Sequence, residues 1–318
     1  MNMLHTDKCK NRLLKLNLQI CKTTFLYLLF FPNIVISGQN GRVQYNPVLP
    51  ISSQRFCFAV LGDRTGSGPD SWTIMDRAID ELNELRPDFI VFIGDIIEGQ
   101  TQSYQAIIEQ WNEADTHFSR VRAPLFMVPG NHDIWDRQSC KIWEKRVGHP
   151  YFSFNHKGCH FLIVNTEDMA AAEPSGLGNE QMEFILRDIS RNRQTSHLYI
   201  FLHKPIWLYP GKLKTQWNQI EKNIEGLNYT VVAGHIHLSA ASLIKGKRFF
   251  ISGPTGGRMR FPRNTQMGLF HHYSWFTVDK DTTTIALIEP GSLVKEEVAR
   301  KAYQRYVQGL FLLKGKDW

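Results

Sequence analysis

The sequence predicts an α/β domain in which buried strands alternate with helices and several strands end in a polar loop. Short apolar runs, such as Phe56 to Leu61, alternate with stretches whose apolar residues recur at helical spacing. Most of these runs lead directly into glycine and a polar side chain, as at Gly62 and Asp63. The 318 residues are 42% apolar, which is ordinary for a globular protein and enough for a full core.

The first part of the domain has the pattern of consecutive βαβ units, which favour parallel pairing of strands. Pro87 ends the first predicted helix shortly before the second strand. In open α/β sheets, ligands bind at the carboxyl ends of such strands. Strands are expected at 56–61, 89–93 and 125–128, and helices at 74–85 and 103–118.

The second part continues this alternation between two predicted hairpins. No internal repeat, low-complexity tract or domain linker interrupts the sequence, so a single domain is expected. Its hairpins are expected at 151–155 with 160–165 and at 275–278 with 284–288, its further strands at 198–202, 229–233 and 248–251, and its helices at 180–191 and 294–307.

The N-terminal segment 1–37 is predicted to be a signal peptide, because a basic region precedes an uncharged apolar run that ends in small residues. A retained signal anchor is the alternative, and contact with a membrane is expected only in that case. Export to the periplasm, the cell surface or the extracellular space would follow. A lead at 38–54, the main domain at 55–290 and a helical tail at 291–318 complete the predicted organisation.

The charge distribution argues against a nucleic-acid-binding protein. The net charge is +7, and the basic residues of segment 1–37 account for +4 of it. No Lys/Arg-rich run follows in the predicted domain, so no specific nucleic acid partner is expected.

Six polar residues at or just after predicted strand ends are candidate metal ligands. Their carboxylate, amide and imidazole groups suit divalent transition metals such as Fe, Mn or Zn. Six ligands exceed one tetrahedral site, so we expect two ions that share a carboxylate. Two metals about 3.5–4 Å apart can activate a bridging water for in-line displacement at phosphorus, which predicts hydrolysis of phosphate esters. The six are Asp63, Asp95, Asn131, His203, His235 and His237.

Taken in order, these motifs resemble the calcineurin-like metallophosphoesterases, from about Arg55 to Pro290. The resemblance implies a four-layer α-β-β-α sandwich of two mixed sheets flanked by helices. It also implies a metal-dependent phosphomonoesterase or phosphodiesterase in which a metal-bridging hydroxide attacks phosphorus in line. The motifs are Gly62-Asp63, Gly94-Asp95, Gly130-Asn131-His132-Asp133, His203 and Gly234-His235-Ile236-His237.

The resemblance further implies a role for each residue. His132 would stay outside the coordination sphere and stabilise or protonate the leaving oxygen, and Asp133 would orient His132. Asp95 would bridge the ions, Asp63 and His237 would bind the first, and Asn131, His203 and His235 would bind the second.

The first metal site departs from the pattern of many family members, which carry a histidine where this chain has Thr65. Purple acid phosphatases also lack that histidine and use a tyrosine three residues after the bridging aspartate. Glu98 occupies this place here. Either Glu98 completes the first site as a hard oxygen ligand that favours Fe or Mn over Zn, or the site has only Asp63, Asp95 and His237.

Two cations adjacent to ligands, Arg64 and Lys204, are candidates for contact with non-bridging phosphate oxygens. Each is equally well explained as a solvated cation at a strand end. Gly256 and Gly257, before Arg258, would suit a loop that approaches the substrate or a plain turn.

Five aromatic residues are expected in loops near the ligands, where they would suit an organic substrate larger than a bare phosphate monoester. A small molecule or a lipid headgroup would qualify, although ordinary packing explains each residue singly. The five are Trp72, Trp135, Trp207, Tyr209 and Trp217.

Two other functions remain open from the sequence. A catalytically weak protein that binds a phosphate ligand would fit the loss of the histidine at Thr65, whereas His132 favours an enzyme. A membrane-held partner protein with structural metals is the other alternative.

Overall fold

The computed structural model describes residues 55–68, 70–170, 176–280, 282–295 and 297–312, within a compact unit that spans residues 42–318. The predicted signal peptide or anchor at 1–37 and the lead at 38–54 lie outside the described residues. Among the described residues, no helix combines the length and the apolar character needed to cross a membrane.

The first sheet joins the start and the end of the domain. β1, β2 and β3 run parallel, and β10, β11 and β12 extend the sheet by antiparallel pairing in the order β12-β11-β10-β1-β2-β3. The strands are β1 Phe56–Leu61, β2 Phe89–Phe92, β3 Leu125–Met127, β10 Tyr273–Asp279, β11 Thr282–Glu289 and β12 Ser292–Lys295.

The second sheet has a parallel centre and antiparallel edges, in the order β4-β5-β6-β7-β9-β8. β5, β6, β7 and β9 are parallel, whereas β4 and β8 pair antiparallel at the two edges. The strands are β4 Phe152–His156, β5 Cys159–Val164, β6 His197–Leu202, β7 Tyr229–Ala233, β8 Ala240–Ile244 and β9 Lys247–Ile251.

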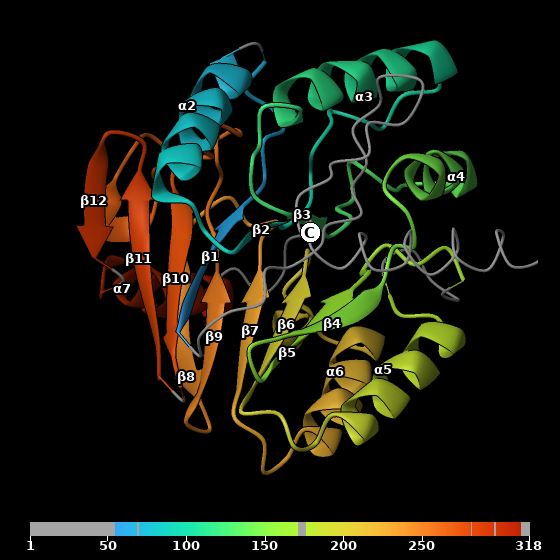
Figure 1. Ribbon diagram of the computed structural model, residues 1–318, viewed down its shortest axis with the longest axis vertical. Helices are drawn as coiled ribbons and strands as arrows, with labels where there is room; N and C mark the ends of the chain where they lie inside the picture. Colours follow the sequence, from blue (N-terminus) through green and yellow to red (C-terminus); the bar gives the residue numbers. More distant parts are fainter. Residues whose placement is uncertain (1–54, 69, 171–175, 281, 296, 313–318) are drawn as a thin grey trace, which may run out of the picture. The chain divides into compact units, whose positions relative to one another are not determined.

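Helices cover the outer face of each sheet. In Figure 1, α2 and α3 lie above the first sheet, and α5 and α6 lie below the second. The four-layer α-β-β-α sandwich of two mixed sheets is therefore confirmed. The helices are α2 Asp70–Leu85, α3 Tyr104–Phe118, α4 Arg137–Arg146, α5 Asn179–Arg191, α6 Lys212–Asn223 and α7 Glu297–Leu312, with short 3₁₀ turns η1 Ile206–Leu208 and η2 Thr265–Met267.

Alternation along the strands divides the core into layers. In β1, Phe58 belongs to the cluster between the sheets, and the next residue, Ala59, belongs to the cluster under the helices. Phe58 stacks on Phe276 of β10 at 4.5 Å and meets Phe161 of β5 edge-on at 5.7 Å. Each buried aromatic side chain contributes about 1.5–3 kcal/mol. This packing holds the two sheets together and thereby fixes the strand ends that carry the candidate ligands.

The tail predicted at 291–318 begins with strand β12 before α7 starts. α7 packs against β8, and its Ala299 and Tyr303 are buried. The described part of the tail is therefore packed into the domain.

Three further elements, α4, α6 and β8, lack a clear signal in the sequence. α6 buries only Gln216, Trp217 and Ile220, so its apolar stripe is too narrow to stand out. β8 is a short edge strand, and its apolar residues do not form the continuous run of a central strand.

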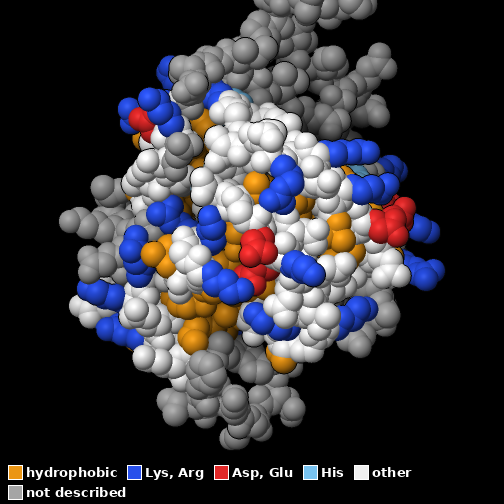
Figure 2. Space-filling model, turned by 90° about the horizontal axis from the view of Figure 1, so that it is seen from below, with side chains coloured by type: hydrophobic (Ala, Val, Ile, Leu, Met, Phe, Trp, Pro, Cys, Tyr) orange, Lys and Arg blue, Asp and Glu red, His pale blue; other side chains and the backbone are white. Residues whose placement is uncertain are grey.

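The face of the molecule shown in Figure 2 carries scattered Lys and Arg side chains, with acidic and apolar side chains among them. They do not form a continuous basic stripe on this face, which is the usual electrostatic sign of a nucleic-acid-binding surface.

Candidate metal centre

The candidate ligands lie in the tight loops that follow the strands. Four of them have left-handed backbone conformations, with φ of 50° at Asp63, 60° at Asp95, 72° at His235 and 57° at His237. Such values are uncommon outside glycine, although aspartate and histidine tolerate them better than most residues. Strained backbone of this kind is frequent at functional sites, and here the tight loops bring the four side chains together.

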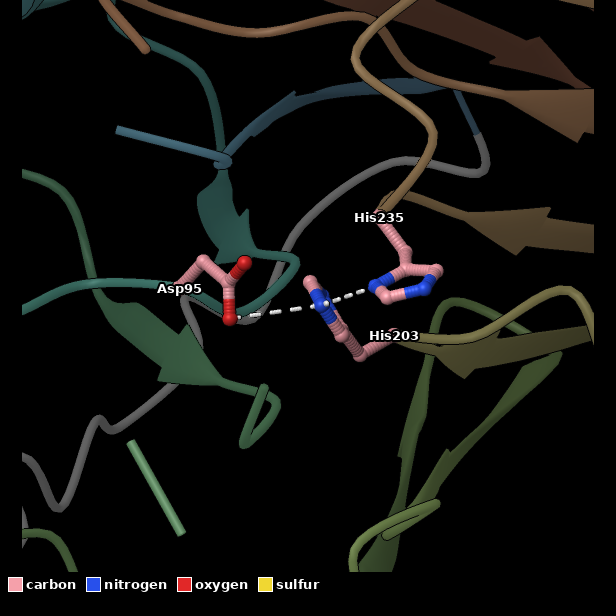
Figure 3. A group of neighbouring side chains, drawn as sticks. All are labelled: Asp95, His203 and His235. Carbon is pink, nitrogen blue, oxygen red and sulfur yellow. Dashed lines mark hydrogen bonds and ion pairs between the residues drawn. The ribbon is translucent and has the colours of Figure 1, made fainter. Parts of the chain in front are cut away.

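Asp95 belongs to two groups of possible metal ligands. One group is Asp63, Asp95 and His237, and the other is Asp95, His203 and His235. Within each group, the ligand atoms lie within 4.8 Å of one another. Figure 3 shows Asp95 and His235 on opposite sides of the His203 ring. This arrangement matches the two ligand sets that the family resemblance implies.

The Asn131 side chain joins the second group. Its Oδ1 lies 3.2 Å from His203 Nε2, which is also 3.3 Å from Asp95 Oδ1 and 3.2 Å from His235 Nδ1. Two imidazole nitrogens, a carboxylate and an amide oxygen thus converge on one small volume. A divalent transition metal matches this donor set.

Backbone carbonyls orient two of the histidines. His203 Nδ1 donates to Ile93 O at 2.9 Å, and His237 Nδ1 donates to Arg258 O at 2.5 Å. In the neutral rings these bonds leave Nε2 as the nitrogen that can bind a metal, and in each ring it faces a carboxylate. Metal-binding histidines are usually held in this way by a hydrogen bond at the other ring nitrogen.

Asp63, Asp95 and His203 are buried and His235 is half-buried, so burial and neighbouring charges shift their pKa values. Burial would lower the pKa of His203, but the adjacent Asp95 and Asp63 carboxylates outweigh it and raise the pKa to about 10. Burial lowers the pKa of His235, and nearby His203 lowers it further, to about 2. Burial also raises the pKa of Asp63.

Two glycines leave space for the carboxylates. A Cβ at Gly130 would lie 2.3 Å from Asp95 Oδ1, and one at Gly234 would lie 2.6 Å from Asp63 Oδ2. Any side chain at either position would displace a candidate ligand.

Comparison with known proteins identifies the family. Residues 58–239, more than half of the 318-residue chain, match the family model described as calcineurin-like phosphoesterase. The chain belongs to the calcineurin-like phosphoesterase family. Together with the ligand groups, this membership makes it a metal-dependent phosphoester hydrolase by general class.

Solved structures share this fold at low sequence identity. A dimetal phosphatase from Danio rerio is 11% identical with a TM-score of 0.62, and the match covers 75% of this chain and 98% of that one. The anchor in the inner membrane complex of Plasmodium is 12% identical with a TM-score of 0.56, over 83% of this chain and 97% of that one. No curated protein matches the sequence. At such identities the likeness shows the fold alone.

The Glu98 carboxylate lies outside both ligand groups. Its two oxygens accept hydrogen bonds from Gly66 N at 2.9 and 3.1 Å, and Oε1 lies 3.5 Å from Arg64. Through these contacts Glu98 holds the loop that follows β1 in place. The geometry favours the alternative in which Asp63, Asp95 and His237 are the protein ligands of the first site.

Neither cation expected at the phosphate is free. The Arg64 guanidinium is buried, lies over the Trp72 ring at 4.4 Å and donates to Ile96 O and Ser71 Oγ, both at 2.6 Å. The Lys204 ammonium pairs with Glu167 at 2.8 Å. Both side chains connect parts of the protein, and neither is presented to a ligand in this structure.

Asp133 does not contact the His132 side chain, contrary to the expectation that it orients this ring. His132 Nδ1 instead donates to Glu98 O at 2.5 Å, which leaves its Nε2 available. The Asp133 carboxylate accepts four backbone hydrogen bonds, from Asp95, Ile96, Ile97 and Gly130. It therefore ties the loop of Asp95 to the loop of Asn131.

Three of the five aromatic residues differ from expectation. Trp72 lies in α2, Trp217 lies in α6, and Trp207 is buried beside Trp217, so these three pack in the core or against its edge. Tyr209 does lie near a ligand, with its ring 6.5 Å from that of His235. Trp135 lies close to Gly99, the residue that follows Glu98.

Proposed function

We propose that this chain hydrolyses phosphate esters with two divalent transition-metal ions, Fe, Mn or Zn, held on either side of Asp95. The supporting observation is that Asp95 belongs to both ligand groups. Asp63 and His237 complete the first site, and Asn131, His203 and His235 complete the second. When bound, such a pair supplies Lewis acidity and an activated water for in-line displacement at phosphorus.

The protein side chains then have distinct tasks. His132 is the proposed leaving-group acid, because its Nδ1 is held by Glu98 O and its backbone N donates to Asp95 Oδ1 at 3.0 Å. This pair of bonds places the ring beside the shared carboxylate with Nε2 unused. A protonated Nε2 would donate to the oxygen on which charge develops as the ester bond breaks.

A catalytically weak phosphate-binding protein is the second candidate. It is favoured by the first site, where Thr65 replaces a histidine and Glu98 is turned toward Gly66 and Arg64. That site is left with three candidate side chains. A weakly held first ion would still permit phosphate binding at the second site while removing most of the catalysis.

Metal content and turnover distinguish the two candidates. The full chain would be loaded with Mn, Fe or Zn and assayed with a nitrophenyl monoester and a bis-nitrophenyl diester. The enzyme predicts two ions per chain and loss of turnover in His132→Gln with both ions retained. His149→Gln is the matched control, because His149 is exposed and packs its ring on that of Tyr151, outside both ligand groups. One ion or none, without turnover, would favour the binding protein.

Export is part of the same proposal, and it rests on the composition of residues 1–37. The mature mass of the protein from a secreting cell, measured with its location, tests it. A shortened chain outside the cytoplasm supports a cleaved signal, a full-length chain in the membrane fraction supports the anchor, and a full-length cytoplasmic chain rejects both.

A further inference from the structure

The loop after β9 connects the two motifs that form the first metal site. Arg258 N donates to Thr65 O at 2.8 Å, and Arg258 O accepts from His237 Nδ1 at 2.5 Å. The Arg258 backbone is thus fixed between the loop that follows Asp63 and the ring of a candidate ligand. The Arg258 side chain therefore begins at a fixed position at the edge of the metal centre.

The Arg258 side chain extends along the first-motif loop. A Cβ placed on Gly66 would lie 2.9 Å from Arg258 Cβ and 3.6 Å from its Cδ, so the aliphatic part of the side chain runs over this glycine. Arg258 is exposed. The side chain is therefore open to solvent at the edge of the first metal site.

Arg260 follows two residues later on the same loop and is also exposed. Its position is limited by the Arg258 backbone, which is bonded to Thr65 O and to the His237 ring. The loop that borders the first metal site thus carries two exposed arginines.

These two arginines differ from the other cations around the centre. Within the described residues, neither side chain has a hydrogen-bond or ion-pair partner, whereas Arg64 and Lys204 are paired with carboxylates. Arg263, on the same loop, forms a two-bonded pair with Glu289. Residues 258–267 include no acidic residue that would neutralise the two free guanidiniums.

We propose that Arg258 and Arg260 form a subsite for a second phosphate group of the substrate, next to the group that is hydrolysed. The preferred substrate class is then a phosphorylated small molecule with two adjacent phosphates. Guanidinium groups suit this role because their paired donors match phosphate oxygens. The proposal rests on the proposed phosphoesterase function and specifies its substrate.

A pair of nucleotides that differ by one phosphate tests the subsite. Water converts ADP to AMP and phosphate, and AMP to adenosine and phosphate, so released phosphate measures both reactions. In the metal-loaded full chain we expect kcat/KM for ADP to fall about tenfold to a hundredfold in Arg258→Gln or Arg260→Gln, because charged hydrogen bonds are lost. The value for AMP should change much less. Arg263→Gln is the matched control and should alter neither value.

Binding measured without turnover separates this proposal from the proposed function. By calorimetry, the wild type should bind pyrophosphate more tightly than phosphate, and Arg258→Gln should remove most of that preference. Selective binding without hydrolysis of any ester would support the subsite and reject the proposed function. Hydrolysis with an unchanged preference for ADP over AMP would reject the subsite alone.

A general basic surface is the competing explanation, and vesicles of phosphatidylcholine with phosphatidylglycerol test it. Equal loss of vesicle binding in the Arg258, Arg260 and Arg263 variants, with an unchanged nucleotide preference, would overturn the subsite. Loss of nucleotide preference confined to the Arg258 and Arg260 variants would support it.

Discussion

Replacement of Asp133 by alanine should loosen two of the loops that carry the second metal site, those of Asp95 and Asn131. Its buried carboxylate accepts backbone hydrogen bonds from Asp95 and Gly130 at 2.8 Å, and from Ile96 and Ile97 at 2.8 and 3.2 Å. Burial and the charge of Asp95 raise the pKa of this carboxyl to about 7, whereas the N–H groups favour its ionised form. Alanine would leave all of these buried donors without an acceptor.

The magnitude follows from the number of donors. An unsatisfied buried donor costs about 1–3 kcal/mol, and water that enters the enlarged space would recover part of this cost. We therefore expect the free energy of unfolding of the metal-free chain to fall by about 3–6 kcal/mol. Because the loops of Asp95 and Asn131 are held together by this carboxylate, metal affinity should fall about tenfold to a hundredfold.

Chemical denaturation with a chelator present measures the first effect, and metal titration of the folded chain measures the second. Asp136→Ala is a nearby control, because Asp136 caps α4 through Ser139 N at 2.7 Å, and its loss should cost only about 1 kcal/mol. If Asp133→Ala retained wild-type stability and metal affinity but lost turnover, Asp133 would act on catalysis and the structural explanation would be wrong.

Three further predictions follow from the centre. Asp95→Asn should reduce the content of both metals, measured by elemental analysis, whereas loss of one ion alone would contradict a shared carboxylate. Glu98→Gln should leave the metal content unchanged but lower the free energy of unfolding by about 1 kcal/mol, because the bonds to Gly66 and Arg64 weaken. Loss of one ion in this variant would instead show that Glu98 is a metal ligand. His203 has a folded pKa of about 10 against an ordinary value of 6.5. Its stabilising effect on the metal-free chain should therefore be complete below about pH 6.5 and decline as the pH rises toward 10. Denaturation at pH 6 and pH 10 would show this decline, and His203→Asn should lack this contribution.

The central strands were predictable because both of their faces are buried. β6 lies between two core layers, with Ile200 in one and Phe201 in the other, so nearly every position is apolar. α6 has few residues in the core, and β8 is an edge strand, so composition alone gives a weak signal for either. The pairing of β10 and β11 was predicted as a local hairpin. Their position beside β1 depends on contacts between residues more than two hundred positions apart, such as Phe58 and Phe276.

That the candidate ligands come together was also predictable, whereas the contacts of the surrounding charged residues were not. Asp63 and Arg64 are adjacent in the sequence, yet Asp63 reaches the metal centre and the Arg64 guanidinium packs on Trp72. The sequence does not show which way each side chain turns, because this depends on acceptors supplied by distant segments, such as Ile96 O for Arg64.

By itself the sequence determined the fold class and pointed to the candidate ligands, because buried strands need apolar runs and metal sites need particular donor atoms at the strand ends. Only the tertiary structure decided which polar groups support those ligands. Asp133 meets backbone N–H groups of another loop, Glu98 meets Gly66, and Arg258 is left unpaired beside His237. A buried charge takes the partner that the folded chain places within hydrogen-bond distance, and that partner is generally far away in the sequence.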